Sequence, residues 1–127
     1  MKTEKKNKYG VKVGDVFLMT WGYEQTNNNF FQVVALAGDL SVRVVEVDPE
    51  LIENKYVSSM AADRIVNLKN CMRKAKSFFI KDQEKGDLKR IKPGYDADRL
   101  PIINITSYAD ARLERESIAT VYDSNYY

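Results

Sequence analysis

The sequence contains no histidine and a single cysteine, Cys71, and both scarcities exclude kinds of site. Histidine is the commonest general base near neutral pH and the commonest metal ligand, so its absence removes much acid–base and transition-metal chemistry. A lone cysteine cannot form an intrachain disulfide, and without histidine beside it a zinc site lacks ligands. We therefore expect a protein of a reducing compartment, with Cys71 as a small, partly buried thiol.

The six glycines are scattered and form no phosphate-binding or dinucleotide-binding pattern. No serine lies in a Gly-x-Ser-x-Gly turn. A hard metal ion would need carboxylates alone, and the best-spaced pair is Asp96 and Asp98, in an expected loop after Pro93-Gly94. A chance surface pair explains these two residues better than a metal site does. The sequence therefore predicts a protein that is not an enzyme and has no catalytic residue, metal site or cofactor.

Long apolar runs are also lacking, since no stretch of 18 apolar residues could cross a bilayer and the first residues are charged. We therefore expect a cytoplasmic protein with no membrane partner.

The length of 127 residues fits one domain. We assign residues 1–10 to a flexible basic tail and residues 11–127 to a single β-rich domain. The oligomeric state stays open.

The net charge of +2 hides an uneven distribution along the chain. Residues 1–12 carry +4 and residues 64–92 carry +7, from ten Lys and Arg against three Asp and Glu, while the rest is acidic. A basic patch made by the 64–92 segment could meet nucleic acid or an acidic protein surface. A solvated lysine-rich face explains the same charges equally well.

Apolar residues favour three successive strands in the first half of the chain. Residues 13–21 are apolar on both alternate sets, which is typical of a strand buried on both faces. Similar runs follow at 30–37 and 40–47, and Gly38-Asp39 between them indicates a tight hairpin. The apolar parity of the third run switches at Val44-Val45, which predicts a β-bulge there. Bulged, bent strands are what small barrels require.

The second half of the chain mixes helix and strand signals. The run from Asp48-Pro49 to Glu53 predicts one or two turns of helix, because it offers a cap, a first-turn proline and acidic residues. Residues 61–76 have helical spacing, although the apolar run inside them fits a short strand equally well. Residues 108–118 have helical propensity.

A second hairpin is indicated by the turn residues 84–87, between apolar runs at 78–80 and 88–91, and Pro101 opens a half-buried strand. Together these patterns predict a mainly β fold: a small bent antiparallel sheet or a partly open SH3-like barrel with one or two short helices. The alternative is an α+β fold with helices near 61–76 and 108–118.

Four aromatic residues surround a short polar loop in the stretch from Trp21 to Phe31. Exposed aromatic side chains beside rim charges are typical of protein contact sites, and the lysines further along could flank them. The residues that we predict to bind a partner are Trp21, Tyr23, Glu24, Gln25, Phe30, Lys74, Lys76 and Lys81. Core packing of Trp21 and Phe31 is the alternative, with Gln25, Thr26 and Asn27 closing the loop through hydrogen bonds to the backbone.

The same stretch resembles a family of small proteins encoded by bacterial phages, plasmids and other mobile elements. Its shared pattern is Gly-Asp-Ile/Val-Phe, then Trp-Gly-Tyr-Asp/Glu-Gln-Thr-Asn, then two aromatic residues, one variable residue and Val-Val. In this chain the pattern and its weaker companion blocks stand at residues 14–17, 21–27, 30–34, 63–69, 105–111 and 120–127. The chain differs from the family by a longer, lysine-rich middle and by lacking a tryptophan near residue 114.

The resemblance has implications for fold and function. It implies strands at 64–69 and 103–113 with a turn at 114–117, in place of the helices that propensity favours. The family has no catalytic role to transfer, and it implies the cytoplasm of a bacterial host as the setting. We therefore expect a non-enzymatic protein that inhibits a host defence system, as anti-CRISPR proteins do, by binding a host protein or ribonucleoprotein. The alternative is a small barrel that binds single-stranded nucleic acid.

Overall fold

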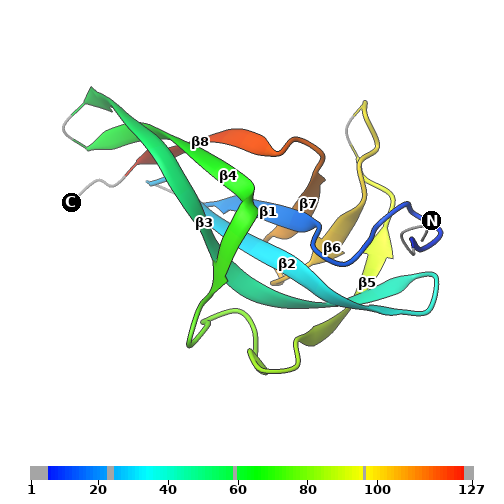
Figure 1. Ribbon diagram of the computed structural model, residues 1–127. Coiled ribbons are helices and arrows are strands. Elements are labelled where there is room, and N and C mark those ends of the chain that lie inside the picture. The colour runs from blue at the N-terminus through cyan, green and yellow to red at the C-terminus, as the bar shows by residue number, and fades with distance from the viewer. Residues whose placement is uncertain (1–5, 23–24, 59, 96, 125–127) are drawn as a thin grey trace, which may run out of the picture.

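The computed structural model describes residues 6–22, 25–58, 60–95 and 97–124. In these residues the chain forms eight strands and no helix, and the strands pair into one antiparallel sheet (Figure 1). No helix in this part of the chain could therefore be long and apolar enough to cross a membrane. The strands are β1 (Val16–Trp21), β2 (Asn27–Ala37), β3 (Ser41–Ser58), β4 (Ala61–Arg73), β5 (Asp87–Lys92), β6 (Ile102–Asn104), β7 (Asp110–Glu114) and β8 (Ile118–Ser124).

Six of these strands close a ring. From β2 the order runs through β1, β7, β6 and β5 to the first part of β3, and β3 pairs with β2 again. The ring encloses most of the first apolar cluster, whose members are buried. The buried members of this cluster are Val11, Phe17, Met19, Phe31, Val33, Val42, Val44, Ile80, Ile91, Ile103, Ile105, Ala111 and Leu113.

A second layer covers part of the ring. β3 continues beyond the ring as one side of a long hairpin with β4, and β4 pairs with β8 (Figure 1). β8 lies beside the start of β2, where the Ser124 amide donates to the Thr26 carbonyl at 3.2 Å. The second apolar cluster fills the space between these strands and the ring, with buried members Val16, Phe30, Val45, Val47, Val66, Leu68 and Val121.

The two clusters explain the apolar pattern of the first strands. β1 is buried on both faces, as predicted, because Phe17 points into the ring and Val16 into the second cluster. β3 does the same, with Val44 in the first cluster and Val45 in the second. The predicted bulge at Val44-Val45 is wrong, because β3 alternates regularly there. The register slips instead in the neighbouring strand, at Val34 of β2.

The expected helices are wrong in all three places. Residues 48–53 lie in β3, residues 61–73 form β4, and residues 108–118 contain β7 and the start of β8. Pairing with a neighbouring strand overrides helix propensity at each site, since propensity is worth less than 1 kcal/mol per residue. Pro49 fits this position because β3 has left β2 by then, so its missing N–H faces an unpaired edge.

The turn signals have a mixed outcome. The hairpin at Gly38-Asp39 is confirmed, since β2 ends at Ala37 and β3 begins at Ser41. Residues 83–85 form the expected turn before β5, but the run at 78–80 is irregular rather than a strand. A strand begins after Pro101, as predicted, and is β6.

The strands implied by the resemblance are partly present. Residues 64–69 lie within β4. Residues 103–113 are not one strand, because a turn at 105–109 divides them into β6 and β7, and the amides of Ile105 and Thr106 both donate to the Ala109 carbonyl. The connection between β7 and β8 covers residues 115–117.

Residues 6–10, which we assigned to a tail, form a turn against the ring. The side-chain oxygen of Asn7 accepts hydrogen bonds from the amides of Tyr9 and Val11, at 2.9 and 3.0 Å. The Lys8 amide donates to the Asp39 carbonyl in the β2–β3 turn. This segment therefore packs on the domain next to the hairpin.

Candidate partner-binding site

The site begins with Glu46, a carboxylate buried in the middle of β3 with only 1% of its surface exposed. Burying a charge is costly unless the charge is paired and hydrogen-bonded. Its Oε1 accepts from the Ser77 hydroxyl at 2.5 Å, and its Oε2 accepts from Asn29 Nδ2 at 3.0 Å and from Lys74 Nζ at 2.9 Å. Glu46 is therefore a fixed anchor with three donors from two other segments.

The backbone of Glu46 holds the same irregular segment, residues 74–86, which we call the lysine loop. The Glu46 amide donates to Gln83 Oε1 at 2.6 Å, and the Glu46 carbonyl accepts from Gln83 Nε2 and from the Lys74 amide. Ser77 Oγ, which donates to the carboxylate, accepts from the amides of Phe79 and Ile80. The loop has no strand pairing, so these bonds to β3 hold its course.

Gly86 at the end of the lysine loop lies against the bulge. Its φ is +88°, and a Cβ there would come 3.0 Å from Val34 Cγ2 and 3.1 Å from the Val44 carbonyl oxygen. Its own carbonyl accepts from Arg43 Nη1 at 3.0 Å. Glycine suits this position, because its left-handed φ is strained for other residues and a Cβ would crowd Val34 and the Val44 backbone.

A chain of hydrogen bonds connects Glu46 to the polar loop of the first hairpin. Trp21 Nε1 donates to Asn29 Oδ1 at 2.7 Å, and the amide group of Asn29 in turn donates to Glu46. Asn27 Nδ2 donates to the Trp21 carbonyl at 3.4 Å, so a side chain closes this loop onto the backbone. The indole of Trp21 is thus fixed in orientation by the buried carboxylate.

Around this indole the structure gathers aromatic side chains from three segments, which we call the aromatic face: Trp21, Phe78, Phe79 and Tyr108. The ring centroid of Trp21 lies 5.9 Å from that of Phe79 and 5.8 Å from that of Tyr108, and the Phe78 and Phe79 centroids are 5.4 Å apart. The two contacts of Phe79 are edge-to-face and the Trp21–Tyr108 contact is tilted, and such contacts favour one arrangement of the rings. Phe79 also contacts the buried ring of Phe31, which joins the face to the core.

The outer part of the aromatic face is open to solvent. Phe78 is 93% exposed and Tyr108 is 61% exposed. Beside Trp21 and Tyr108 lies a shallow hollow of about 620 Å³, lined by Thr20, Trp21, Gly22, Tyr108, Ala109 and Asp110. Asp110 is the one carboxylate among the described residues of this lining. The hollow therefore offers ring surface and a polar edge, which suits binding better than acid–base chemistry.

The structure separates the predicted contact residues of the first hairpin. Trp21 is half-buried at the centre of the aromatic face. Gln25 is half-buried in the loop, and its backbone carbonyl oxygen lies close to Gly22, where a Cβ would clash with it. Phe30 is 2% exposed and belongs to the second apolar cluster, so its ring offers no contact surface. Tyr23 and Glu24 lie outside the described residues.

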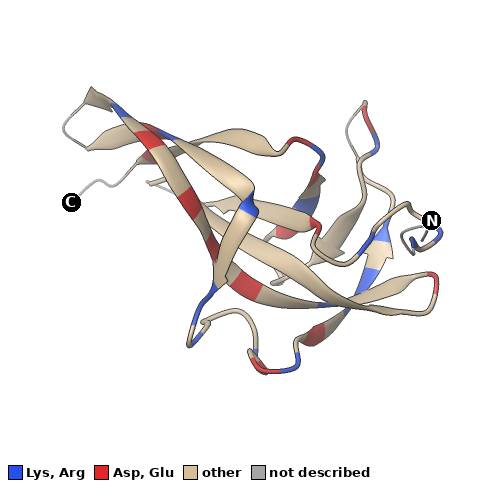
Figure 2. Ribbon diagram, viewed as in Figure 1, with Lys and Arg blue, Asp and Glu red and all other residues tan. Residues whose placement is uncertain are grey.

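The three predicted lysines all lie in the lysine loop, but they differ in surroundings. Lys74 binds Glu46 and lies 3.8 Å from Asp48, so its charge is compensated. Lys76 and Lys81 are exposed on either side of the phenylalanine pair. The lysine loop also carries Asp82 and Glu84, so its charge is mixed (Figure 2).

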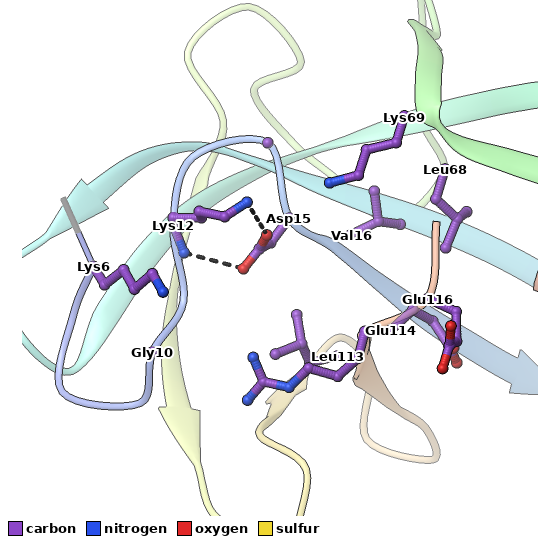
Figure 3. A pocket seen from close by; sticks show the side chains of 12 residues that line it. Lys6, Gly10, Lys12, Asp15, Val16, Leu68, Lys69, Leu113, Glu114 and Glu116 are labelled. Carbon is purple, nitrogen blue, oxygen red and sulfur yellow. Dashed lines mark hydrogen bonds and ion pairs between the residues drawn. The ribbon is translucent and has the colours of Figure 1, made fainter. Parts of the chain in front are cut away.

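A second cavity, of about 150 Å³, lies between the turn before β1 and the β7–β8 connection (Figure 3). Lys12 binds Asp15 across its mouth, with Nζ 3.4 Å from Oδ1, and Lys69 extends over Val16 from β4. Burial raises the pKa of the Glu114 carboxyl in its wall; nearby Arg112 lowers that pKa and Glu116 raises it. Because charges of both signs line this cavity, we assign it no ligand.

Asp96 lies outside the described residues, so its pairing with Asp98 is not described.

Sequence reasoning missed the residues that organise the site. Glu46, Asn29 and Ser77 form the buried network, and Phe78, Phe79 and Tyr108 complete the aromatic face. Only Glu46 gives a signal in the sequence, since it is a lone charge between valines in a strand that is apolar on both faces. The contact of Tyr108 with Trp21 joins positions 87 residues apart, which no local pattern indicates.

Comparison of the chain with protein-family models, with curated proteins and with solved structures gave no match.

Proposed function

We propose that this protein is a non-enzymatic binding protein that holds a macromolecular partner on its aromatic face. The observation that carries the proposal is the exposure of Phe78 and Tyr108 on a base fixed by the buried Glu46 network. Rigid aromatic side chains give large contact area at low entropic cost, and they are enriched among residues that dominate binding energies. Exposed rings of this kind are otherwise costly to keep in water.

We propose a protein or ribonucleoprotein of a bacterial host defence system as the partner, so that the protein acts as an inhibitor in the manner of an anti-CRISPR protein. This step rests on the resemblance of the Trp21–Phe31 stretch to mobile-element proteins, and the host cytoplasm as its setting rests on the same resemblance. We also place the ring of strands in the SH3-like class of small barrels. Its closure between β2 and β3 supports that assignment.

The test is capture from a bacterial host lysate, followed by mass spectrometry, with variants that change only the aromatic face. Phe78→Ala and Tyr108→Ala should each reduce capture of the partner about tenfold or more, because truncating a central aromatic contact costs about 2 kcal/mol or more. Both side chains are exposed and each loses one ring contact worth about 1 kcal/mol, so the melting temperature should fall by no more than a few degrees. Tyr95→Ala is the matched control, since Tyr95 is also exposed but lies in the loop at the opposite end of β6 (Figure 1). Equal capture by all three variants would refute the proposed face.

Single-stranded nucleic acid is the second candidate partner. The observation that favours it is the position of exposed Phe78 between Lys76 and Lys81, since unpaired bases stack on rings while lysines contact phosphates. This candidate predicts binding of a labelled oligonucleotide that weakens steeply between 50 and 200 mM salt. Lys76→Gln and Lys81→Gln together should lower the slope of that salt dependence by about 1.4, because each phosphate contact to a single strand contributes about 0.7. Binding that is absent at 50 mM salt, or that does not depend on salt, would exclude it.

A further inference from the structure

The outer half of β3 has an unpaired edge. β2 pairs with β3 only as far as Val47, and β5 only as far as Val44, whereas β4 pairs with it to Ser58. Residues 50–58 therefore have a strand on one side and, among the described residues, none on the other. Figure 1 shows this part of β3 as the outer side of a hairpin that projects from the ring.

This edge is apolar as well as unpaired. Leu51, Ile52, Tyr56 and Val57 are between 50% and 76% exposed, and together they surround the charged centre of the segment. A free strand edge presents backbone donors and acceptors to any other strand, and an apolar edge adds a reason to pair. Among the described residues, these four side chains keep at least half of their surface exposed.

We propose that this edge binds a second copy of the same chain, with the two β3 strands antiparallel about Asn54. In that register Glu53 of each copy lies opposite Lys55 of the other, which gives two oppositely charged pairs. Beyond these pairs, the apolar side chains of Leu51, Ile52, Tyr56 and Val57 flank the ladder on either side in both copies. Opposite charges and apolar side chains that face one another across antiparallel strands stabilise the pairing.

The charge pattern is what selects a second copy as the occupant. Within the described residues Glu53 and Lys55 form no ion pair in the single chain, although they are two positions apart on one strand. A two-fold axis through Asn54 places Glu53 of one copy opposite Lys55 of the other, and Lys55 of the first opposite Glu53 of the second. An isologous interface requires this kind of self-complementarity. Figure 2 shows charges of both signs along this part of the sheet.

The bulges in β3 set the length of the shared ladder. Relative to β4, β3 has an extra residue between Leu51 and Glu53 and another between Tyr56 and Ser58. The regular part of the ladder therefore covers residues 53–55, and the apolar side chains on either side add the remaining contact. The result is a continuous sheet of β8, β4 and β3 from each copy. So short a ladder predicts a dimer that dissociates on dilution.

The test is sedimentation equilibrium or light scattering of the full chain from micromolar to millimolar concentration. Glu53→Lys alone and Lys55→Glu alone should each weaken dimerisation about tenfold or more, since both place like charges opposite each other twice. The double variant Glu53→Lys with Lys55→Glu restores opposite charges, so its dimerisation should return to within about threefold of the original.

Charge reversals elsewhere serve as matched controls. Lys85→Glu and Glu84→Lys change the net charge by the same amounts but lie exposed in the lysine loop, so they should leave dimerisation unchanged. A chain that stays monomeric at millimolar concentration would overturn the proposal. A dimer that both single reversals leave intact, or that the double variant fails to restore, would also overturn it, because the two copies would then meet elsewhere.

Discussion

Replacing Glu46 by alanine should be the most damaging single change at the site. The substitution removes the acceptor of three hydrogen bonds and leaves the partly buried Asn29 Nδ2 and Ser77 Oγ without this partner. Lys74 loses its main counter-charge but is about one-third exposed, so it can turn towards water and Asp48. Removing one member of a buried charged pair costs about 3 to 5 kcal/mol, and the freedom of Lys74 favours the lower end.

A loss of about 3 kcal/mol is a large share of a typical unfolding free energy of about 5 to 15 kcal/mol. In urea it should lower the midpoint of unfolding by about 2 M, with a slope of about 1.5 kcal/mol per molar. The single tryptophan reports the local change, because Trp21 Nε1 binds the amide side chain that Glu46 orients. Its fluorescence in the folded state should therefore change as well.

Glu50→Ala is the control, since it removes the same charge from the same strand. Glu50 is exposed and accepts two hydrogen bonds, from Asn67 and Asn70, at 3.2 Å each. Its loss should change the unfolding free energy by about 0.5 kcal/mol or less. If Glu46→Ala destabilised the protein no more than Glu50→Ala does, the carboxylate would not be the anchor of the lysine loop.

Two further predictions concern protonation. Burial raises the pKa of the Glu114 carboxyl, while Arg112 lowers that pKa and Glu116 raises it. The folded state therefore binds the carboxyl proton more tightly than the unfolded state does. As the pH rises above the pKa of the unfolded state, ionisation of Glu114 lowers the free energy of unfolding. Glu114→Gln should therefore raise the melting temperature at pH 7 but not at pH 3, and an equal effect at both would contradict this. Burial, with a smaller effect of Asp48, raises the pKa of the Cys71 thiol, so its alkylation by iodoacetamide at pH 8 should be slower than in the urea-unfolded chain. An equal rate in both states would show that the thiol is not perturbed.

The first half of the fold could be predicted because its signals are local. β1 carries apolar residues on both alternate sets, and Gly38-Asp39 marks the turn between β2 and β3 directly. The switch of apolar parity at Val44-Val45 is real, but a bulge in β3 is the wrong explanation for it. It reflects two apolar clusters on the two faces of one strand, and a local pattern cannot distinguish that arrangement from a bulge.

The second half could not be predicted from local signals, because its strands depend on distant partners. Residues 61–67 pair with 118–124, and residues 61–67 alone carry helix and strand signals of similar strength. The proline at position 49 is a helix-start signal in the sequence, yet it lies at a strand edge in the structure. The aromatic face was missed for the same reason, since Trp21 meets Tyr108 and Phe79 only after the ring closes.

β3 has one further consequence, for how this sequence can vary. An ordinary antiparallel strand has one face in water, so half its positions can change freely while the other half keep the fold. From Val42 to Val47 that freedom is almost absent, because five of the six side chains are buried, in two clusters and at the Glu46 network. Natural variants of this segment should therefore change by compensated pairs rather than singly, and the same six residues tie the ring and the outer layer into one cooperative folding unit.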